Sequence, residues 1–291
     1  MTENGSPSNK TLLATMAHPD DETFGVGGTL AFYAQQGVDV HVLCATNGEE
    51  GTVSEEDLGT YSSIAELRTE KELRCATDKL GVSGLHLLGY RDSGMYGSTS
   101  NDNPDCLNQA PIEEVARRIA TTIRQVQPQV VITHDPNGNY FHPDHIAVHR
   151  ATVRAFEITS DPDIQLDDLP PFKPDKLYFN TWPKRIFQIL IRIAPFFGLN
   201  PREFGRNKDI DLVEIVGEDS FPIDTVVNYR KVASIKKEAT ACHQSQLSGG
   251  PPAFGVLGMI MRLMGDKDWY TQAYPEKQSK RKEKDLFSGV N

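Results

Sequence analysis

The sequence predicts an α/β fold built on a mostly parallel sheet, and two observations carry this prediction. Between residues 11 and 157, short apolar runs alternate with longer segments in which apolar residues recur at helical spacing. Two of the longer segments end at a glycine, Gly37 and Gly81, which is a common stop signal for helices. Alternation of this kind is typical of βαβ units with right-handed crossovers, and no internal repeat is present.

Each element of this region follows from its own pattern. The predicted strands are rich in Val, Leu and Ile, and the predicted helices carry an apolar residue every three or four positions. The expected strands are 11–17, 38–45, 85–89 and 129–133. The expected helices are 25–36, 62–80, 112–126 and 142–156.

The regular alternation weakens after residue 157. The expected elements there are strands at 176–182 and 211–216 and a helix at 229–243. We therefore predict a core at 11–157 and a less regular C-terminal α/β portion at 158–291. This second portion is expected to complete the sheet and to cap the substrate site, so that both parts form one integrated domain.

Composition excludes some classes of protein. The 291 residues include 30 Lys+Arg and 40 Asp+Glu, a formal net charge of −10, which argues against a general nucleic-acid binder. No apolar run reaches the ~18 residues of an integral membrane span, and the N-terminus lacks a secretory leader pattern. Two apolar stretches, 186–197 and 254–264, are expected to be buried; a dimer face, a substrate wall or a membrane contact are the alternatives.

Cysteine usage predicts a reducing environment. Cys44, Cys75, Cys106 and Cys242 are too few and too scattered for a disulfide framework, and no C-x-x-C pair exists. Such usage is typical of a cytoplasmic protein. The sequence leaves open whether the chain forms a homo-oligomer.

Two clusters of polar residues carry the chemistry. AHPDDE at 17–22 follows the first predicted strand, and HPDH at 142–145 follows the fourth and opens a helix. Both clusters are therefore expected at the carboxyl edge of the sheet, where open α/β folds bind ligands. Each cluster alone could be an ordinary acidic or solvent-facing helix start. Two of them at one edge favour a functional site.

The residue types suit a catalytic metal. His18, Asp21 and His145 form a His₂Asp set that fits Zn²⁺ with one open position, and the same set also fits Fe²⁺. Asp20 and His142 are left over. Hydrolysis at a metal needs a base for the attacking water and a proton donor for the leaving group, and these two residues can supply them.

With these motifs the sequence resembles the PIG-L/LmbE-like family of zinc-dependent N-acetylglucosaminyl deacetylases. The further matching segments are TNGE at 46–49, GYRDSGM at 89–95, HD at 134–135 and HQSQ at 243–246. The resemblance is close over about 11–150 and weaker over 230–246. It implies a Rossmann-like catalytic, metal-binding core and a small amino-sugar substrate.

The resemblance also implies a role for each matching residue. The metal ligands would be His18, Asp21 and His145, and Asp20 would be the general base. His142 would be the protonated acid or electrostatic stabiliser, and the Asp144 carboxylate would orient His142. Tyr140 would donate a hydrogen bond to the oxyanion, and Asp92 would contact a substrate hydroxyl.

Some matches are less regular. Relatives place a sugar-binding arginine at the position that counting back from Gly81 gives to Thr69, so either the helix is offset by one residue and Arg68 makes the contact, or the contact is lost. In the family the late histidine, here His243, can approach the site, and we count it as substrate-binding. For His134 a functional and a structural role are about equally favoured, and His149 is expected to be a helix-face residue.

The expected function is a zinc-dependent deacetylase that hydrolyses the N-acetyl amide of an N-acetylglucosamine-type sugar or conjugate and releases acetate. One alternative is an amidase that cleaves a thiol-sugar conjugate or another amide. An alternative from another class is a non-catalytic zinc- or sugar-binding module.

Overall fold

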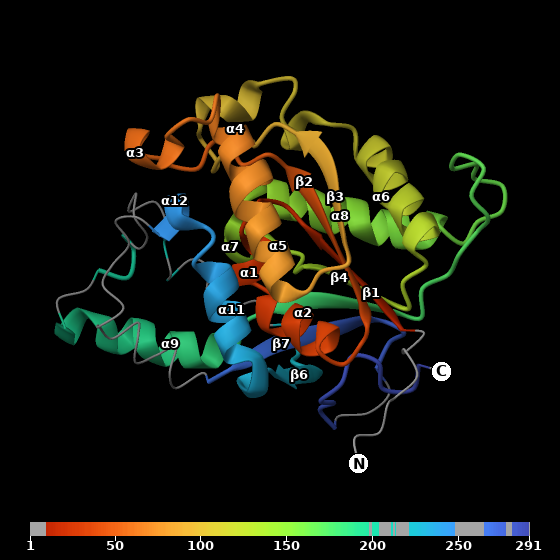
Figure 1. The fold of residues 1–291 in the computed structure, drawn as a ribbon. Helices are drawn as coiled ribbons and strands as arrows, with labels where there is room; N and C mark the ends of the chain where they lie inside the picture. Colours follow the sequence, from red (N-terminus) through yellow and green to blue (C-terminus); the bar gives the residue numbers. More distant parts are fainter. Residues whose placement is uncertain are drawn as a thin grey trace, which may run out of the picture.

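A single seven-stranded sheet forms the centre of the molecule, with strand order β3-β2-β1-β4-β5-β7-β6 (Figure 1). This computed structural model describes residues 10–197, 200–203, 211, 213, 221–247, 265–277 and 281–290. The strand expected at 211–216 lies, apart from two residues, outside the described residues, and the apolar stretch 254–264 lies wholly outside them.

The sheet is parallel over its larger part. The strands are β1 (Thr11–Met16), β2 (Asp39–Thr46), β3 (Gly84–Tyr90), β4 (Val130–His134), β5 (Lys176–Thr181), β6 (Thr225–Asn228) and β7 (Lys267–Tyr274). Strands β1 to β5 pair in parallel, with Leu12 of β1 opposite both Val40 and Val130. Strand β7 runs antiparallel between β5 and β6. The predicted mostly parallel α/β fold is confirmed.

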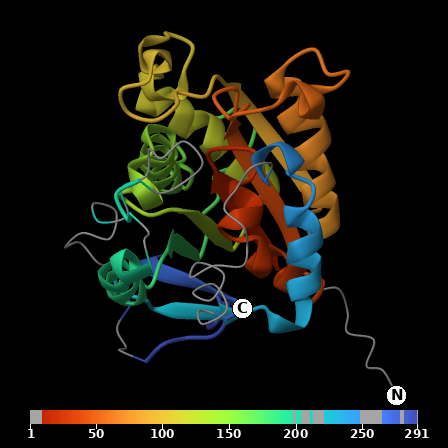
Figure 2. The same cartoon turned by 90° about the vertical axis from the view of Figure 1, so that its left-hand side faces the viewer.

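Helices cover both faces of this sheet. Helices α2, α5 and α11 pack on one face, and α6 and α8 pack on the other (Figure 2). The helices are α1 (Asp21–Phe24), α2 (Gly27–Ala34), α3 (Glu55–Leu58), α4 (Ile64–Glu66), α5 (Arg74–Leu80), α6 (Ile112–Val126), α7 (Gly138–Phe141), α8 (Pro143–Ile158), α9 (Lys184–Ile193), α11 (Ala233–Thr240) and α12 (Gln244–Leu247). A π-helix, η1 (Leu67–Leu73), joins α4 to α5.

Burial on both faces explains why the parallel strands are apolar throughout. Along β1, Leu12 and Ala14 pack into the core beneath α2, whereas Leu13 packs with Ile119 of α6 and Val148 of α8. A strand covered on both sides cannot show a polar face, so it appears in sequence as a short continuous apolar run.

The order of the strands places a topological switch point between β1 and β4. Strand β2 lies on one side of β1 and strand β4 on the other, so the chain direction around the sheet reverses between β1 and β4. Ligands of open α/β sheets bind at the carboxyl ends of the strands at such a switch point. The AHPDDE cluster follows β1, and the HPDH cluster follows β4.

The C-terminal half extends the same sheet. Strand β5 falls within the expected strand 176–182, and α11 falls within the expected helix 229–243. Strands β6 and β7 were not predicted. The apolar stretch 186–197 forms part of α9 and the 3₁₀ turn Ala194–Phe197, where Ile189 and Phe196 are exposed. The division at residues 157 and 158 remains a prediction.

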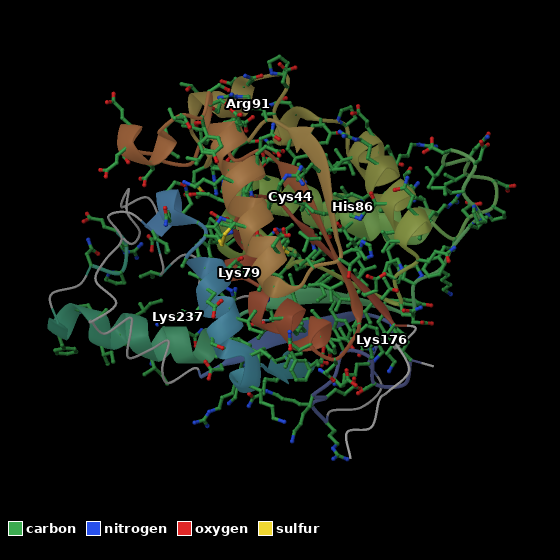
Figure 3. The ribbon with its side chains drawn as sticks, viewed as in Figure 1. Cys44, Lys79, His86, Arg91, Lys176 and Lys237 are labelled. Carbon is green, nitrogen blue, oxygen red and sulfur yellow. A yellow bond between two sulfur atoms is a disulfide. The ribbon has the colours of Figure 1, made fainter. Side chains whose placement is uncertain are left out.

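The cysteine spacing predicts no disulfide framework and a reducing environment, and the structure contains one disulfide. Cys75 of α5 and Cys242, which follows α11, form a disulfide across 167 residues of sequence (Figure 3). The segments around them lie side by side because α11 packs against α5. Cys44 and Cys106 are free and buried. Among the described residues, no helix is long and apolar enough to cross a membrane.

Candidate active site

The two predicted clusters meet at the carboxyl edge of the sheet. His18 lies just beyond β1, and His142 caps the N-terminus of α8, with Pro143 in the first helical turn. This cap starts the helix so that His145 points back toward β1, and the rings of His18 and His145 lie 5.0 Å apart between centroids. The structure thus brings together residues separated by more than a hundred positions in sequence.

Three ligand atoms form a compact triangle. His18 Nδ1 lies 3.1 Å from His145 Nε2 and 3.4 Å from Asp21 Oδ2, and the latter two atoms are 3.3 Å apart. Tetrahedral zinc, with bonds of about 2.0–2.1 Å, holds its ligand atoms about 3.3 Å from one another. His18, Asp21 and His145 therefore fit a divalent cation with a fourth position left open.

The contacts of His18 Nε2 show that Nδ1 is the ring nitrogen that faces the other two ligand atoms. His18 Nε2 lies 3.2 Å from Asp144 Oδ2 and 3.6 Å from Asp92 Oδ1. Burial lowers the pKa of His18, but the carboxylates of Asp92, Asp144 and Asp21 outweigh it and raise that pKa well above its usual value. A cation at Nδ1 would replace the proton there and leave the Nε2 proton facing a carboxylate, as metal-bound histidines commonly require. Asp144 also accepts hydrogen bonds from the Ser93 N–H and hydroxyl, which fix its position.

The contact expected between the Asp144 carboxylate and His142 differs in the structure. Asp144 meets His142 through its backbone, because the Asp144 N–H donates to His142 Nδ1 at 3.2 Å. The carboxylate instead contacts His18. Asp144 is thus arranged to orient His18, a difference that follows from its position in the first turn of α8.

The helix cap also determines the proton on His142. Because His142 Nδ1 accepts a backbone hydrogen bond, a neutral ring carries its proton on Nε2. Burial lowers the pKa of His142 well below its usual value, and positive charge on His18 and His145 lowers it further. A bound cation would act in the same direction. The chain's own groups therefore favour a neutral Nε2–H donor rather than the protonated histidine that the resemblance implies.

Other groups of ligand-type side chains overlap this triangle. Among the described residues they are His18–His142–His145, His18–Asp92–His142–Asp144 and Asp21–His134–His145. His142 is a poor ligand in the tautomer described above. His134 Nε2 already accepts the Ala17 N–H at 3.1 Å, and its Nδ1 contacts Asn139. In the His18–Asp21–His145 set the two ring nitrogens contact each other and no backbone N–H of the described residues, and Asp21 Oδ2 accepts the His18 N–H at 2.8 Å but has a second lone pair.

Asp20 lies beside the triangle and forms an ion pair with Arg68. The distance from Asp20 Oδ2 to Arg68 Nη2 is 2.6 Å, and the Asp20 side chain keeps 17% of its surface exposed. Burial raises the pKa of Asp20 to about 6, with a further rise from Asp21, while Arg68 opposes it. A carboxylate with this pKa is suited to accept a proton near neutral pH.

A sugar contact of Arg68 stays a prediction, and the structure places the Arg68 side chain against residues of the site itself. Arg68 is 2% exposed and donates to the carbonyls of Gly48 and Pro19, at 2.8 and 2.6 Å. Thr69 instead donates to Ala65 within its own helix. Arg68 and Thr69 both lie in the π segment Leu67–Leu73, where the hydrogen bonds run from residue i to residue i+5.

Tyr140 lies on the other side of the site. Its hydroxyl is 3.5 Å from His145 Nε2, and the two rings meet edge to face. The backbone of α7 departs from helical values at Asn139 and Tyr140, which aims the phenol into the site. Burial raises the pKa of Tyr140, with an additional rise from Asp21, so the phenol stays a neutral hydrogen-bond donor.

The residues expected to bind substrate differ in exposure. Asp92 is 4% exposed and faces His18, and it accepts the Gly94 N–H at 2.8 Å. Burial opposes its ionisation, yet the charge and hydrogen bond of His18 hold the pKa of Asp92 well below its usual range. His243 is fully buried and contacts Glu22 at 2.8 Å, so it does not present a surface to a substrate.

Several residues at the site were missed. Glu22 and Ser93 are fully buried and hold Asp20 and Asp144, and Glu72 holds the late HQSQ segment. Glu22 and Ser93 belong to the AHPDDE and GYRDSGM segments, so their motifs were the available signal. His149 contacts the His134 carbonyl from α8, in agreement with a helix-face role.

Fold and site together define an α/β protein with a buried His/Asp cluster that could bind a metal. The PIG-L family, described as GlcNAc-PI de-N-acetylase, matches residues 13–156. A protein of Thermomonospora curvata is 36% identical over 91% of each chain, and one of Acidothermus cellulolyticus is 35% identical over 97% of this chain and 96% of its own. Both are named 1D-myo-inositol 2-acetamido-2-deoxy-alpha-D-glucopyranoside deacetylase.

The chain belongs to the PIG-L family. The predictions of this family and of an N-deacetylase class of enzyme are confirmed by these relatives, which are named as deacetylases.

Solved structures show the same fold at lower identity. The N,N′-diacetylchitobiose deacetylase from Pyrococcus horikoshii aligns with a TM-score of 0.60 and 19% identity, covering 92% of this chain and 86% of its own. A 4-carboxy-2-hydroxymuconate hydratase from Pseudomonas putida aligns with a TM-score of 0.59 and 20% identity, covering 94% and 99%. These likenesses describe the fold alone, because one fold serves several reactions.

Proposed function

We propose that this protein is a zinc-dependent deacetylase that hydrolyses the N-acetyl amide of an N-acetylglucosamine-type sugar or conjugate and releases acetate. The observation that carries the proposal is the triangle of His18 Nδ1, Asp21 Oδ2 and His145 Nε2, with the Asp20 carboxylate beside it. The relatives named as deacetylases of a glucosaminyl inositol support the same α-linked N-acetylglucosaminyl inositol as substrate here.

The metal would be held by His18, Asp21 and His145. When bound, a divalent cation supplies Lewis-acid polarisation of the acetamide carbonyl and makes water more acidic. The set also suits Fe²⁺, so the choice between the two ions rests on metal availability as well as on the ligands.

Asp20 acts as the general base. Its carboxylate accepts a proton from the attacking water, and Arg68 favours the charged form of Asp20 at 2.6 Å. The proton is then delivered to the amide nitrogen, which leaves as the amine. Water adds to the carbonyl carbon, the C–N bond breaks, and the products are acetate and the free amino sugar.

Tyr140 and His142 stabilise the charge that develops on the carbonyl oxygen. The Tyr140 hydroxyl and the His142 Nε2–H are neutral donors on the side of the site that holds His145, and donors aimed at a developing oxyanion lower the barrier. Asp92, next to His18, is the group proposed to receive a substrate hydroxyl.

The test is to incubate zinc-loaded protein with N-acetylglucosaminyl inositol, N-acetylglucosamine and diacetylchitobiose and to measure free amine and acetate. We expect turnover that Asp20→Asn lowers by about 10²–10⁴-fold without loss of metal. No turnover on any sugar amide would contradict the proposal. A non-catalytic binding module would bind zinc and sugar yet release no amine, and turnover of a thiol-sugar amide alone would favour the amidase.

The cytoplasmic location stays a prediction, and the disulfide is an observation that argues against it. Disulfides are rare in reducing compartments, where they are usually catalytic or redox-sensing. The Cys75–Cys242 bond therefore disagrees with the prediction made from cysteine spacing.

A further inference from the structure

The late HQSQ segment is held between two buried glutamates of the catalytic half. His243 Nε2 lies 2.8 Å from Glu22 Oε1, and Ser245 donates through its N–H and its hydroxyl to the two oxygens of Glu72, each at 2.8 Å. All four residues are at most 1% exposed. The His243 and Ser245 side chains do not face solvent, and the mechanism above leaves them without a role.

Glu22 contacts the backbone of the proposed base, and Glu72 lies in the same helix as the arginine that forms its ion pair. The Asp20 N–H donates to Glu22 Oε2 at 2.9 Å, and Glu72 lies one turn after Arg68 in the same π-helix. Asp20 has a φ of 145°, a backbone conformation that a residue other than glycine rarely adopts. Such a conformation persists only where surrounding contacts hold it, and the Glu22 carboxylate is one of these contacts.

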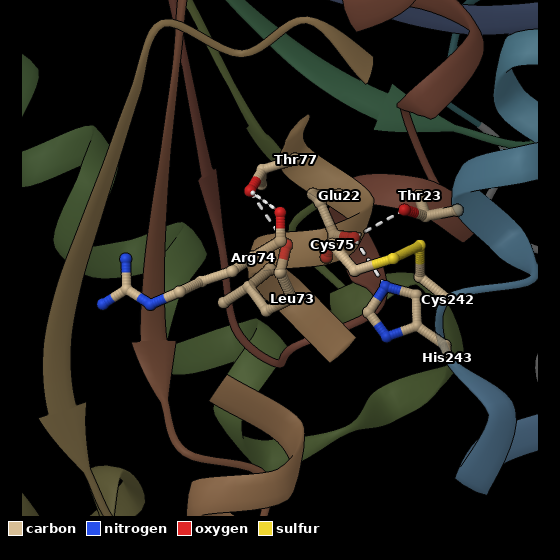
Figure 4. The surroundings of a disulfide bond; sticks show 8 residues. All are labelled: Glu22, Thr23, Leu73, Arg74, Cys75, Thr77, Cys242 and His243. Carbon is tan, nitrogen blue, oxygen red and sulfur yellow. Dashed lines mark hydrogen bonds and ion pairs between the residues drawn. A yellow bond between two sulfur atoms is a disulfide. The ribbon is translucent and has the colours of Figure 1, made fainter. Parts of the chain in front are cut away.

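A covalent tether holds the segment against these glutamates. Cys242, which immediately precedes His243, is bonded to Cys75 near Glu72, and Figure 4 shows the disulfide beside the His243–Glu22 contact. Thr23 donates to the same Glu22 oxygen as His243. Burial lowers the pKa of His243, but the carboxylates of Glu22 and Asp20 outweigh it and raise that pKa overall.

We propose that His243 is a positioning residue: through Glu22, and tethered by the Cys75–Cys242 disulfide, it holds Asp20 where a general base must stand. The inference rests on the proposed function, since it assumes that Asp20 is the base. The C-terminal portion would then contribute to the reaction through a contact below the site. It predicts that the loss of the His243 donor lowers the rate of the chemical step and leaves substrate binding and metal binding intact.

The experiment compares two amides at one position. His243→Gln can place an N–H close to the position of Nε2, whereas His243→Asn is shorter and cannot reach Glu22. The readouts are kcat, KM, zinc content and melting temperature on N-acetylglucosaminyl inositol. His86→Asn is the matched control, because His86 is a partly exposed histidine of β3 that contacts His41 and lies away from the disulfide (Figure 3).

We expect H243N to lower kcat by about 10- to 100-fold, as small misplacements of a catalytic group do, with KM within about twofold and zinc content equal to the parent. H243Q should stay within about threefold of the parent. In an Asp20→Asn background, H243N should have no further effect, because both changes remove the same contribution.

Three outcomes would overturn the inference: a folded H243N with the parent's kcat, an H243Q as slow as H243N, or loss of zinc from H243N. If the parent turns over substrate but D20N does so equally well, the role of Asp20 in the proposed function fails instead. If H243N does not fold, the same readouts are taken on the double variant Cys75→Ser/Cys242→Ser, which removes the tether that holds His243 against Glu22; there an unchanged kcat overturns the proposal.

Discussion

Asp20 stands between opposing influences that set its protonation. Burial and the neighbouring Asp21 raise its pKa, and the Arg68 guanidinium at 2.6 Å lowers it. The result is a pKa of about 6, close enough to neutral pH for the carboxylate to be both charged and basic. The base is therefore tuned by a residue of the π-helix as much as by its own motif.

The pH profile of kcat/KM should report this balance. Asp20 works as a base only when ionised, so activity should fall as pH drops through about 6. Arg68→Met removes the charge that lowers the Asp20 pKa and should move the acidic limb upward by roughly one pH unit. Arg68→Lys keeps the charge and should leave the limb near its parent position. A limb at the same pH in R68M and parent would contradict this account.

Asp144 should affect metal binding more than the base. Its carboxylate contacts His18 Nε2 at 3.2 Å and thereby orients the ring with Nδ1 toward the other two ligand atoms. Asp144→Asn should weaken zinc binding by about 10–100-fold, measured by competition with a chelator. Asp20→Asn serves as the comparison and should bind zinc as the parent does. Equal zinc affinity in D144N and parent would remove this role from Asp144.

Single residues differ in how far the sequence predicts them. His18, Asp21 and His145 could be selected because ligand-type residues follow two strands whose carboxyl ends must meet. The contact between His243 and Glu22 depends on the path of the chain across more than two hundred residues, and no local pattern encodes it. The pairing of Cys75 with Cys242 could not be predicted from the sequence for the same reason.

At the scale of elements, prediction succeeded where the pattern of apolar residues is regular. The helix expected at 112–126 coincides with α6, because its apolar and charged faces alternate regularly. Strands β6 and β7 were missed because they pair with each other across a long separation in sequence and mix polar with apolar residues. Antiparallel pairs at the margin of a sheet carry a weaker apolar signal than its parallel centre.

The packing of α2 against the C-terminal half depends on one glycine. A Cβ at Gly28 would come within 2.1 Å of the Tyr229 ring, so Gly28→Ala should lower the free energy of unfolding by about 1–3 kcal/mol. Tyr229→Ala removes the obstacle. In chemical denaturation, the double variant should lose less than the sum of the two single losses. Additive losses would show that the ring and the glycine do not interact.

At the scale of the whole molecule, the two halves share one sheet and are also joined by a disulfide. Cys75 belongs to the region that resembles the family closely, and Cys242 belongs to the part that resembles it weakly. The bond closes a loop of 167 residues of sequence separation, so it restricts the unfolded chain strongly. The stability of the whole should therefore depend on its redox state.

Alkylation and unfolding should reveal this dependence. Denatured protein treated with an alkylating reagent should bind two labels without reductant, on Cys44 and Cys106, and four after reduction. Cys75→Ser/Cys242→Ser should lower the free energy of unfolding by about 2–4 kcal/mol. Reduced parent should match this variant, because both lack the same constraint. Cys106→Ser, a change at a buried free cysteine, controls for the loss of a thiol and should make no difference to the effect of reductant. Four labels without reductant would show that the bond does not form.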